Sequence, residues 1–348
     1  MIEHKIEHKR ADQKAGFPKT RAGLLLALLV AANVVVWLLT LFAAHGHPSL
    51  LAAGLLAYGF GLRHAVDADH ISAIDNTTRK LMRDGGRPLG VGLFFSLGHS
   101  TIVILLCVCL ALSTAYVQAH LPEWKTVGSL IGSLVSSIFL YLIGVINLIV
   151  LWDLIKTYRS ILKGSVSQDH ALEESLDQRG LLARLFRPLL RAIRSSWQMY
   201  VVGFLFGLGF DTASEVGILT LSARSGQAGT PLWMILLLPA LFTVGMCLVD
   251  TLDGILMLGA YGWAYIKPVR KLYYNIAITA ISVTVAFAVA TSGLWQLGGN
   301  DLPFRGKFGA FFDDNLGYII VGLFLMVWAV SALIYRMKGD KSSPATTL

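Results

Sequence analysis

The stretch RHAVDADHISAIDNTTRK, residues 63–80, places two histidines and three aspartates in a chain that is otherwise strongly apolar. Ionisable side chains are unfavourable at the depth of a bilayer, so a group of them there indicates a functional site. Imidazole together with carboxylate suits borderline divalent ions such as nickel, cobalt or zinc. Copper(I) prefers sulfur, whereas magnesium and calcium prefer oxygen alone. The residue types therefore predict a site for a divalent transition metal.

The spacing of these residues sets a geometric condition on the site. On an ideal helix His64, Asp67 and His70 recur at i, i+3 and i+6 and form one stripe. The rise from His64 to His70 is about 9 Å, which is long for one metal centre. A shared ion therefore requires the helix to bend or unwind, and Gly59 and Gly61 favour a distortion just upstream.

Three other apolar segments carry polar residues at helical spacing. His99 follows a glycine in the third, Asp211 and Glu215 are four apart in the fifth, and Asp250 and Asp253 are three apart in the sixth, so each pair shares a helix face. The predicted metal-binding residues are His64, Asp67, Asp69, His70, His99, Asp211, Glu215, Asp250 and Asp253.

Acidic residues outnumber basic ones within the predicted spans. Seven carboxylates, the six acidic residues of the predicted site together with Asp75, face the single positive charge of Arg63. Protons or a cation must neutralise such a group. The alternative for some of them is a wet helix end. Asp75 and Asn76 are interpreted as such an inner end, and Arg79 and Lys80 as topology anchors.

The elements that must position these residues are apolar runs long enough to cross a hydrocarbon core of about 30 Å. The chain has 348 residues, of which 55% are hydrophobic and only 14% charged, which is typical of a polytopic membrane protein. We predict an all-α fold with eight transmembrane helices, at 22–43, 50–75, 89–114, 127–151, 199–222, 231–257, 272–294 and 316–336. The first run is too long for a signal peptide and is retained as a span.

The distribution of basic residues sets the predicted topology. Of 29 lysines and arginines, all but five fall on the side of the N-terminus; Lys125, Arg224, Arg305 and Lys307 lie opposite and Arg63 lies within a span. This positive-inside bias predicts cytoplasmic N- and C-termini. The net charge of +8 is therefore attributed to topology and not to nucleic-acid binding. A bacterial cytoplasmic (inner) membrane is the expected location.

The predicted divisions of the chain follow from this topology. They are a cytoplasmic N-terminal arm at 1–21, helices one to four at 22–151, a basic cytoplasmic loop at 152–198, helices five to eight at 199–336 and a cytoplasmic tail at 337–348. The loop is either an amphipathic segment on the lipid surface or a solvated linker. His4 and His8 are assigned to a solvated arm, and Cys107, Cys109 and Cys247 to apolar packing.

An internal similarity suggests a repeat. YGFGLRHAVDAD resembles LFGLGFDTASE, and FFSLGHS resembles LFTVGMC. The offsets agree, because Phe60 and Phe206 are 146 residues apart and Phe95 and Phe242 are 147 apart. We therefore predict that spans 1–3 and 4–6 are copies. Copies with an odd number of spans run in opposite directions, as in the inverted repeats of many transporters.

Four segments carry a resemblance to a known family. RHAVDADHI with its HxxxxDH core, FFSLGHST, LGFDTASE and GMCLVDTLDG resemble the signatures of the nickel/cobalt transporter family, in order and each in a separate span. The match covers essentially the whole chain and resembles the high-affinity nickel permeases of hydrogen-oxidising bacteria. The resemblance implies that His64, Asp69 and His70 are the essential HxxxxDH residues. It implies the same for the other signature positions, His99, Asp211, Glu215, Asp250 and Asp253.

The resemblance implies high-affinity uptake of Ni²⁺, with Co²⁺ as a second substrate, by a single-chain secondary permease without a cofactor. No GxxxxGK[ST] sequence occurs, so neither ATP hydrolysis in the chain nor an ATPase subunit is expected. One alternative is an exporter of divalent transition metals. Another is an intramembrane metalloenzyme, although the HExxH of a zinc protease is absent.

Overall fold

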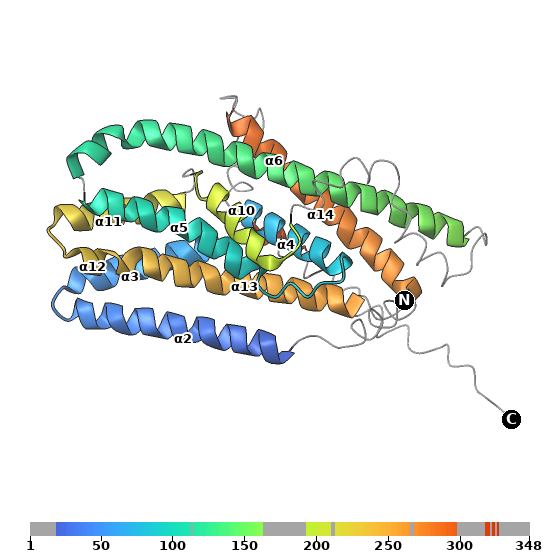
Figure 1. Cartoon of the computed structure of the whole chain (residues 1–348), viewed down its shortest axis with the longest axis horizontal. Coiled ribbons are helices and arrows are strands. Elements are labelled where there is room, and N and C mark those ends of the chain that lie inside the picture. The colour runs from blue at the N-terminus through green and yellow to red at the C-terminus, as the bar shows by residue number, and fades with distance from the viewer. Residues whose placement is uncertain are drawn as a thin grey trace, which may run out of the picture.

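The computed structural model describes residues 19–112, 114–162, 193–209, 213–264, 268–297, 317–320, 322–323 and 326. Within these residues every regular element is a helix, which confirms the predicted all-α class (Figure 1). The elements are α2 (Lys19–Ala44), α3 (Pro48–His64), α4 (Ala68–Arg83), α5 (Val91–Leu112), α6 (Thr114–Leu162), the short 3-10 turn η1 (Ser196–Gln198), α10 (Met199–Phe206), α11 (Ala213–Gln227), α12 (Leu232–Ile235), α13 (Leu237–Ala264) and α14 (Pro268–Leu297).

Several of these helices can cross a membrane. Among the described residues four are long and apolar enough, at Thr20–Ala44, Val91–Ala111, Leu130–Ser160 and Leu232–Gly259. The pair Pro48–His64 and Ala68–Met82 gives a fifth candidate if the two halves form one bent span. The candidate spans within the described residues therefore support a multi-pass helical membrane protein. The predicted count of eight remains a prediction, and most of 316–336 lies outside the described residues.

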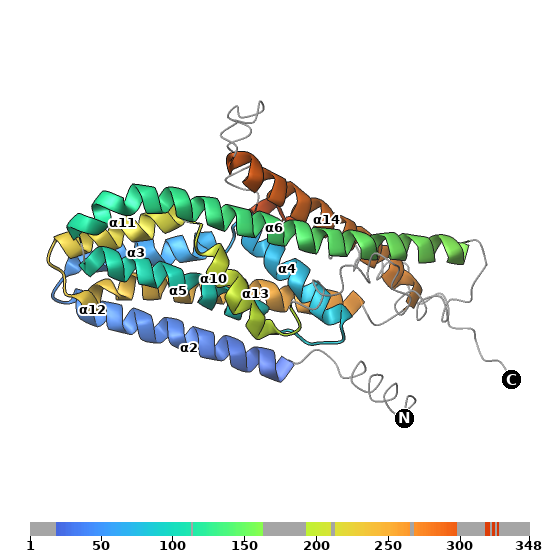
Figure 2. The same ribbon diagram turned by 45° about the horizontal axis from the view of Figure 1, so that its top comes forward.

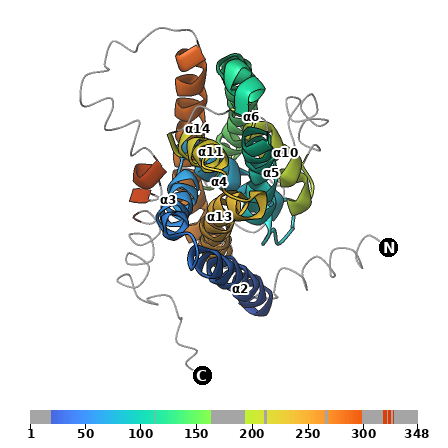
Figure 3. The same ribbon diagram turned by 90° about the vertical axis from the view of Figure 1, so that its left-hand side faces the viewer.

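The helices pack into a bundle with α4 at its centre. Helix α13 contacts α2, α3, α4 and α5, while α10 packs on α5 and α6 packs along α14. Helix α4 contacts α13, α14, α6 and α5, and an end-on view places it in the middle of the bundle (Figure 3). Helix α2 lies at the edge and presents apolar side chains outward, with Phe42 78% exposed. An apolar outer surface of this kind fits a lipid environment.

Helix α4 is polar and yet buried. Asp75, Asn76, Arg79 and Lys80 are each at most 4% exposed. The interpretation of Asp75 and Asn76 as a wet end is therefore wrong, whereas the role of Arg79 and Lys80 as topology anchors stays a prediction. The physical reason is that neighbouring helices supply polar partners, so the polar face of α4 can be buried in protein.

Those partners come from two directions. On one side Asn147 of α6 donates a hydrogen bond to Asn76. On the other, Arg79 donates to Thr279 and Ser282 of α14. Figure 2 shows the short helix α4 beneath α6 and beside α14. The central helix of the bundle is thus held by side-chain hydrogen bonds as well as by apolar packing.

The break in the second predicted span lies downstream of His64, and not at Gly59 and Gly61 as expected. Helix α3 continues through both glycines to His64, and α4 starts at Ala68 at an angle of 51° to it. Asp67 has an extended backbone (φ −66°, ψ 145°) at the N-cap of α4, and its side chain makes no capping hydrogen bond there. The fifth predicted span is interrupted as well, because α10 ends at Phe206 and α11 begins at Ala213.

Candidate metal centre

Three histidines from three helices meet in the interior of the bundle. His64 is the last residue of α3, His70 lies in the first turn of α4, and His99 lies in α5. Their ring centroids are 4.6 Å (His64–His70), 4.7 Å (His64–His99) and 5.0 Å (His70–His99) apart. All three side chains are buried. The break between α3 and α4 therefore brings His64 and His70 together, which a straight helix would keep about 9 Å apart along its axis.

The ring nitrogens are close enough to share one ion. Each histidine offers one nitrogen, and these nitrogens all lie within 4.8 Å of one another. Nε2 of His64 and Nε2 of His99 are 2.9 Å apart. Two nitrogens about 2.1 Å from a metal and at right angles are about 3.0 Å apart, so this pair already has a chelating separation. An ion at this point would replace the hydrogen bond between the two rings.

A carboxylate from the fifth predicted span completes the group. Glu215 lies in the first turn of α11, and its Oε1 is 2.9 Å from Nε2 of His99 and 3.8 Å from Nε2 of His64. The glutamate is buried. Three imidazoles and one carboxylate are a donor set that suits Ni²⁺, Co²⁺ or Zn²⁺. We refer to His64, His70, His99 and Glu215 as the histidine centre.

Asp67 orients His64. Its Oδ2 lies 2.9 Å from Nδ1 of His64, while its Oδ1 accepts a 2.9 Å hydrogen bond from Nη1 of Arg63. The hydroxyl of Ser214 is 3.2 Å from the same Nδ1. With Nδ1 engaged in this way, Nε2 is the nitrogen directed to the centre. Carboxylate partners of this kind fix the tautomer and raise the basicity of a metal-binding histidine.

His70 has a corresponding arrangement with α13. Its Nδ1 lies 3.2 Å from Oδ2 of Asp250, which also accepts a 2.5 Å hydrogen bond from Ser96. Nε2 of His70 is buried and has no hydrogen-bond partner among the described residues. Helices α5 and α13 approach closely at this level, because a Cβ on Gly92 would lie 2.0 Å from the carbonyl oxygen of Asp250. The free ring nitrogen is thus available for an ion.

Asp69 has a local structural contact. Its Oδ1 accepts a 2.9 Å hydrogen bond from the backbone N–H of His70 in the first turn of α4. The first N–H groups of a helix have no partner within the helix, and a nearby aspartate satisfies one of them. Asp69 therefore stabilises the start of α4, from which His70 projects.

The structure thus groups the predicted site residues by position. His64, His70, His99 and Glu215 form the centre, Asp67 and Asp250 contact the outer nitrogens of two of its rings, and Asp69 contacts backbone. Asp253 lies on α13 beyond Asp250, and Asp211 lies outside the described residues. Direct metal binding by these residues remains a prediction.

Sequence reasoning missed the contacts of Ser96, Ser214 and Arg63. Two of them had a local signal. Ser96 precedes His99 by three residues and so shares its helix face, and Ser214 immediately precedes Glu215.

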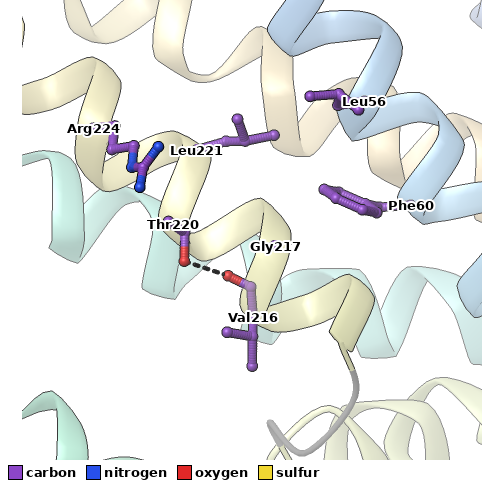
Figure 4. Close-up of a pocket in the computed structure, with 7 residues that line it drawn as sticks. All are labelled: Leu56, Phe60, Val216, Gly217, Thr220, Leu221 and Arg224. Atoms are coloured by element: carbon purple, nitrogen blue, oxygen red, sulfur yellow. Dashed lines mark hydrogen bonds between the residues drawn. The ribbon is translucent and has the colours of Figure 1, made fainter.

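A separate groove lies between α3 and α11. It has a volume of about 520 Å³ and is lined by Leu56, Phe60, Val216, Gly217, Thr220, Leu221 and Arg224 (Figure 4). The lining is apolar apart from Thr220 and Arg224 and offers neither imidazole nor carboxylate. The groove is therefore distinct from the histidine centre.

Comparison with known proteins gives a consistent result. The family model NicO, described as high-affinity nickel-transport protein, matches residues 50–334. A high-affinity nickel transport protein of Cupriavidus necator is 48% identical over 93% of this chain and 94% of its own length. The nickel transporter NicT of Mycobacterium tuberculosis is 45% identical over 91% of this chain and 89% of its own.

A relative named for another metal also matches. The cobalt transport protein NhlF of Rhodococcus rhodochrous is 38% identical over 91% of this chain and 94% of its own length. No solved structure gives a significant match.

Proposed function

This chain belongs to the NicO family of high-affinity nickel-transport proteins, and from that premise we propose that it carries Ni²⁺ across the membrane into the cytoplasm as a single-chain permease. Relatives named as nickel transporters match most of its length, and one relative is named for cobalt. We therefore include Co²⁺ as a second substrate. In this proposal the chain is a permease and not an enzyme, and the metal ion is its cargo.

The observation that carries the proposal is the histidine centre. Three imidazoles and Glu215 lie buried among apolar helices, where an ionisable group without a ligand or partner is unfavourable. When imidazole ligands replace the water bound to an ion, nickel and cobalt gain more than magnesium and calcium do. This difference in affinity is what a site needs in order to select nickel or cobalt from other hydrated divalent cations.

Transport through the centre follows from its geometry. The ion loses water as the ring nitrogens of His64, His70 and His99 replace it, and Glu215 supplies negative charge. The second predicted span is interrupted between α3 and α4, beside His64 and His70, and the fifth is interrupted between α10 and α11, beside Glu215. These breaks provide points about which the two halves of each span can move. Membrane potential can drive the step, because a divalent cation gains about 4.6 kcal/mol per 100 mV on moving inward.

In the proposed arrangement the chain crosses the bacterial inner membrane eight times, and both termini lie in the cytoplasm. Four helices and the bent pair α3–α4 support five of these spans, and the interrupted pair α10–α11, α14 and the helical residues 317–320 fall within three further predicted spans. The arm at 1–21, the loop at 152–198 and the tail at 337–348 would face the cytoplasm. The charge distribution along the chain supports this orientation.

We also propose the inverted repeat, with spans 1–3 related to 4–6. Its support is the matched packing of the interrupted helices. A Cβ on Gly61 of α3 would lie 2.2 Å from the carbonyl oxygen of Phe242, and a Cβ on Gly203 of α10 would lie 1.9 Å from that of Phe95. Phe242 and Phe95 are the residues paired by the sequence repeat. Helix α3 therefore meets α13 much as α10 meets α5.

Uptake of radioactive nickel by whole cells tests the proposed function. Cells that express the chain should accumulate the label from low concentrations, and unlabelled Ni²⁺ and Co²⁺ should compete more strongly than Mg²⁺. A lower content of nickel in expressing cells than in control cells would instead indicate export. Equal content in both would overturn transport of nickel by this chain.

A further inference from the structure

Beyond the histidine centre, a second group of acidic side chains lies between α4 and α13. Asp75 and Asp250 are completely buried. Asp253 lies three residues after Asp250 on the same helix face, and α13 packs against α4, which carries Asp75. Three carboxyl groups from two helices therefore share one buried region, which we call the carboxylate site.

Two oxygen atoms at this site have no partner within the described part of the chain. Asp250 directs Oδ2 to His70 and Ser96, whereas its buried Oδ1 accepts no hydrogen bond. The buried Oδ2 of Asp253 likewise accepts none. Buried polar atoms are nearly always satisfied, so these two carboxylate oxygens call for a ligand or a proton. The ligand that carboxylate oxygens select is a cation.

One cationic side chain already stands beside this group. Nη2 of Arg79 lies 3.6 Å from Oδ2 of Asp75, and the buried guanidinium donates hydrogen bonds to Thr279 (2.8 Å) and Ser282 (2.5 Å) of α14. Ser282 in turn donates a 2.8 Å hydrogen bond to Asp75. The guanidinium thus bridges α4 to α14 and places one positive charge beside Asp75 at the edge of the carboxylate site.

We propose that Asp75, Asp250 and Asp253 form a second binding site for the transported divalent cation, and that Arg79 is a tethered cation that partly neutralises this site when no metal ion is present. The inference rests on the proposed transport function. It adds a second binding site, made of oxygen ligands, which the ion reaches after the imidazole ligands of the histidine centre.

The two sites are linked through Asp250. One oxygen of this residue contacts His70 of the histidine centre and the other is free to bind at the carboxylate site. Asp75 lies about 7.5 Å beyond His70 along α4, which is one short step for an ion. Nickel binds oxygen ligands less tightly than imidazole, so the carboxylate site holds the ion weakly enough to release it.

Arg79 gives the carboxylate site a means of opening. A divalent cation that reaches Asp75 and Asp253 repels the guanidinium and takes over its carboxylate partner. The bridge from α4 to Thr279 and Ser282 is then weakened. Since α4 leads to the loop that we place in the cytoplasm, the arrival of the ion loosens the helix contact on the inner side.

Equilibrium dialysis of the purified full-length protein against Ni²⁺ alone tests this inference. The unaltered chain should bind two ions, the second more weakly than the first. Asp253→Asn should remove the second ion and retain the first. Arg79→Gln should tighten the second by about tenfold or more, because a positive charge about 4 Å from the site is lost. Thr251→Val, a near-isosteric change of a buried neighbour on α13, should change neither.

Arg79→Gln leaves Asp75 without its cation and can impair folding, so Asp75→Asn/Arg79→Gln provides a neutral pair. This double variant should bind the first ion only. A second ion that binds equally well to Asp253→Asn and to the unaltered chain would overturn the carboxylate site. Binding of a single ion by the unaltered chain and by every variant would overturn it too, and is the result expected if protons alone neutralise these carboxylates. Binding of the first ion tests the proposed function separately. If this ion is lost in His99→Gln and retained in the variants of the carboxylate site, it binds at the histidine centre.

Discussion

At the scale of single residues, the carboxylate of Asp67 contacts two basic side chains at once. One oxygen binds Arg63 and the other binds Nδ1 of His64. Arg63 thereby limits where the carboxylate can lie, and the carboxylate determines which nitrogen of His64 faces the centre. Asp250 plays the matching part for His70. Under the proposed function, the selectivity of the centre depends on the residues that orient its ligands as well as on the ligands themselves.

Asp67→Asn should weaken nickel binding without abolishing it. The amide still reaches His64 but no longer provides a charge, and loss of such a partner typically lowers metal affinity by about 10- to 100-fold. Uptake should therefore show a raised KM, with the maximal rate largely restored at high nickel concentration. An unchanged KM would contradict an orienting role for Asp67.

Removal of a ring nitrogen should have a larger effect than removal of its partner. His99→Gln leaves the centre with two imidazoles, and uptake from low nickel concentrations should fall to the level of cells without the chain. His47→Gln is the matched control, because His47 is exposed at the turn between α2 and α3. Equal uptake by the two variants would exclude His99 as a ligand.

At the scale of elements, the break between α3 and α4 creates the centre, and the sequence predicted it only in part. The clustering of His64 and His70 required a distortion, which the spacing made clear. Its place was predicted upstream, at the glycines, whereas it lies downstream of His64, where Asp67 adopts an extended backbone.

The burial of α4 also could not be predicted from the sequence. A helix with this many polar residues resembles a solvated end, and only the partners on α6, α13 and α14 make its burial favourable. Those partners are between 71 and 207 positions away along the chain. Local pattern can indicate which residue types need a partner, but not which distant helix supplies it.

The glycines of α3 give a test at this scale. A Cβ on Gly61 would lie 2.2 Å from the backbone oxygen of Phe242, so Gly61→Ala must push α3 away from α13. Overpacking of this kind typically costs about 1–3 kcal/mol. A Cβ on Gly59 meets nothing within 4 Å, so Gly59→Ala is the control. Thermal unfolding followed in detergent should give a lower Tm for Gly61→Ala only, and equal values would argue against this close approach.

At the scale of the whole molecule, polarity is arranged from the inside outward. The central helix α4 and the histidine centre are polar and buried, whereas α2 and other outer helices expose apolar side chains. A bundle of this kind places a polar route within a shell that tolerates lipid. The predicted multi-pass helical class follows from composition and run length, which is why it could be predicted securely.

The proposed topology can be tested by labelling. In a variant whose three cysteines are replaced by alanine, Gly46→Cys lies at the exposed turn between α2 and α3, and Asp84→Cys lies just after α4. A membrane-impermeant thiol reagent should label Gly46→Cys in intact cells and Asp84→Cys only in inside-out vesicles. Labelling with the opposite sidedness would invert the proposed orientation.

We propose that one nickel ion binds between His64, His70 and His99. X-ray absorption at the nickel edge, measured on purified full-length protein loaded with one equivalent of Ni²⁺, tests it most directly. We expect a shell of nitrogen and oxygen ligands with the outer scattering of about three imidazoles, and a loss of one imidazole in His99→Gln. A shell of oxygen ligands without imidazole scattering would contradict it.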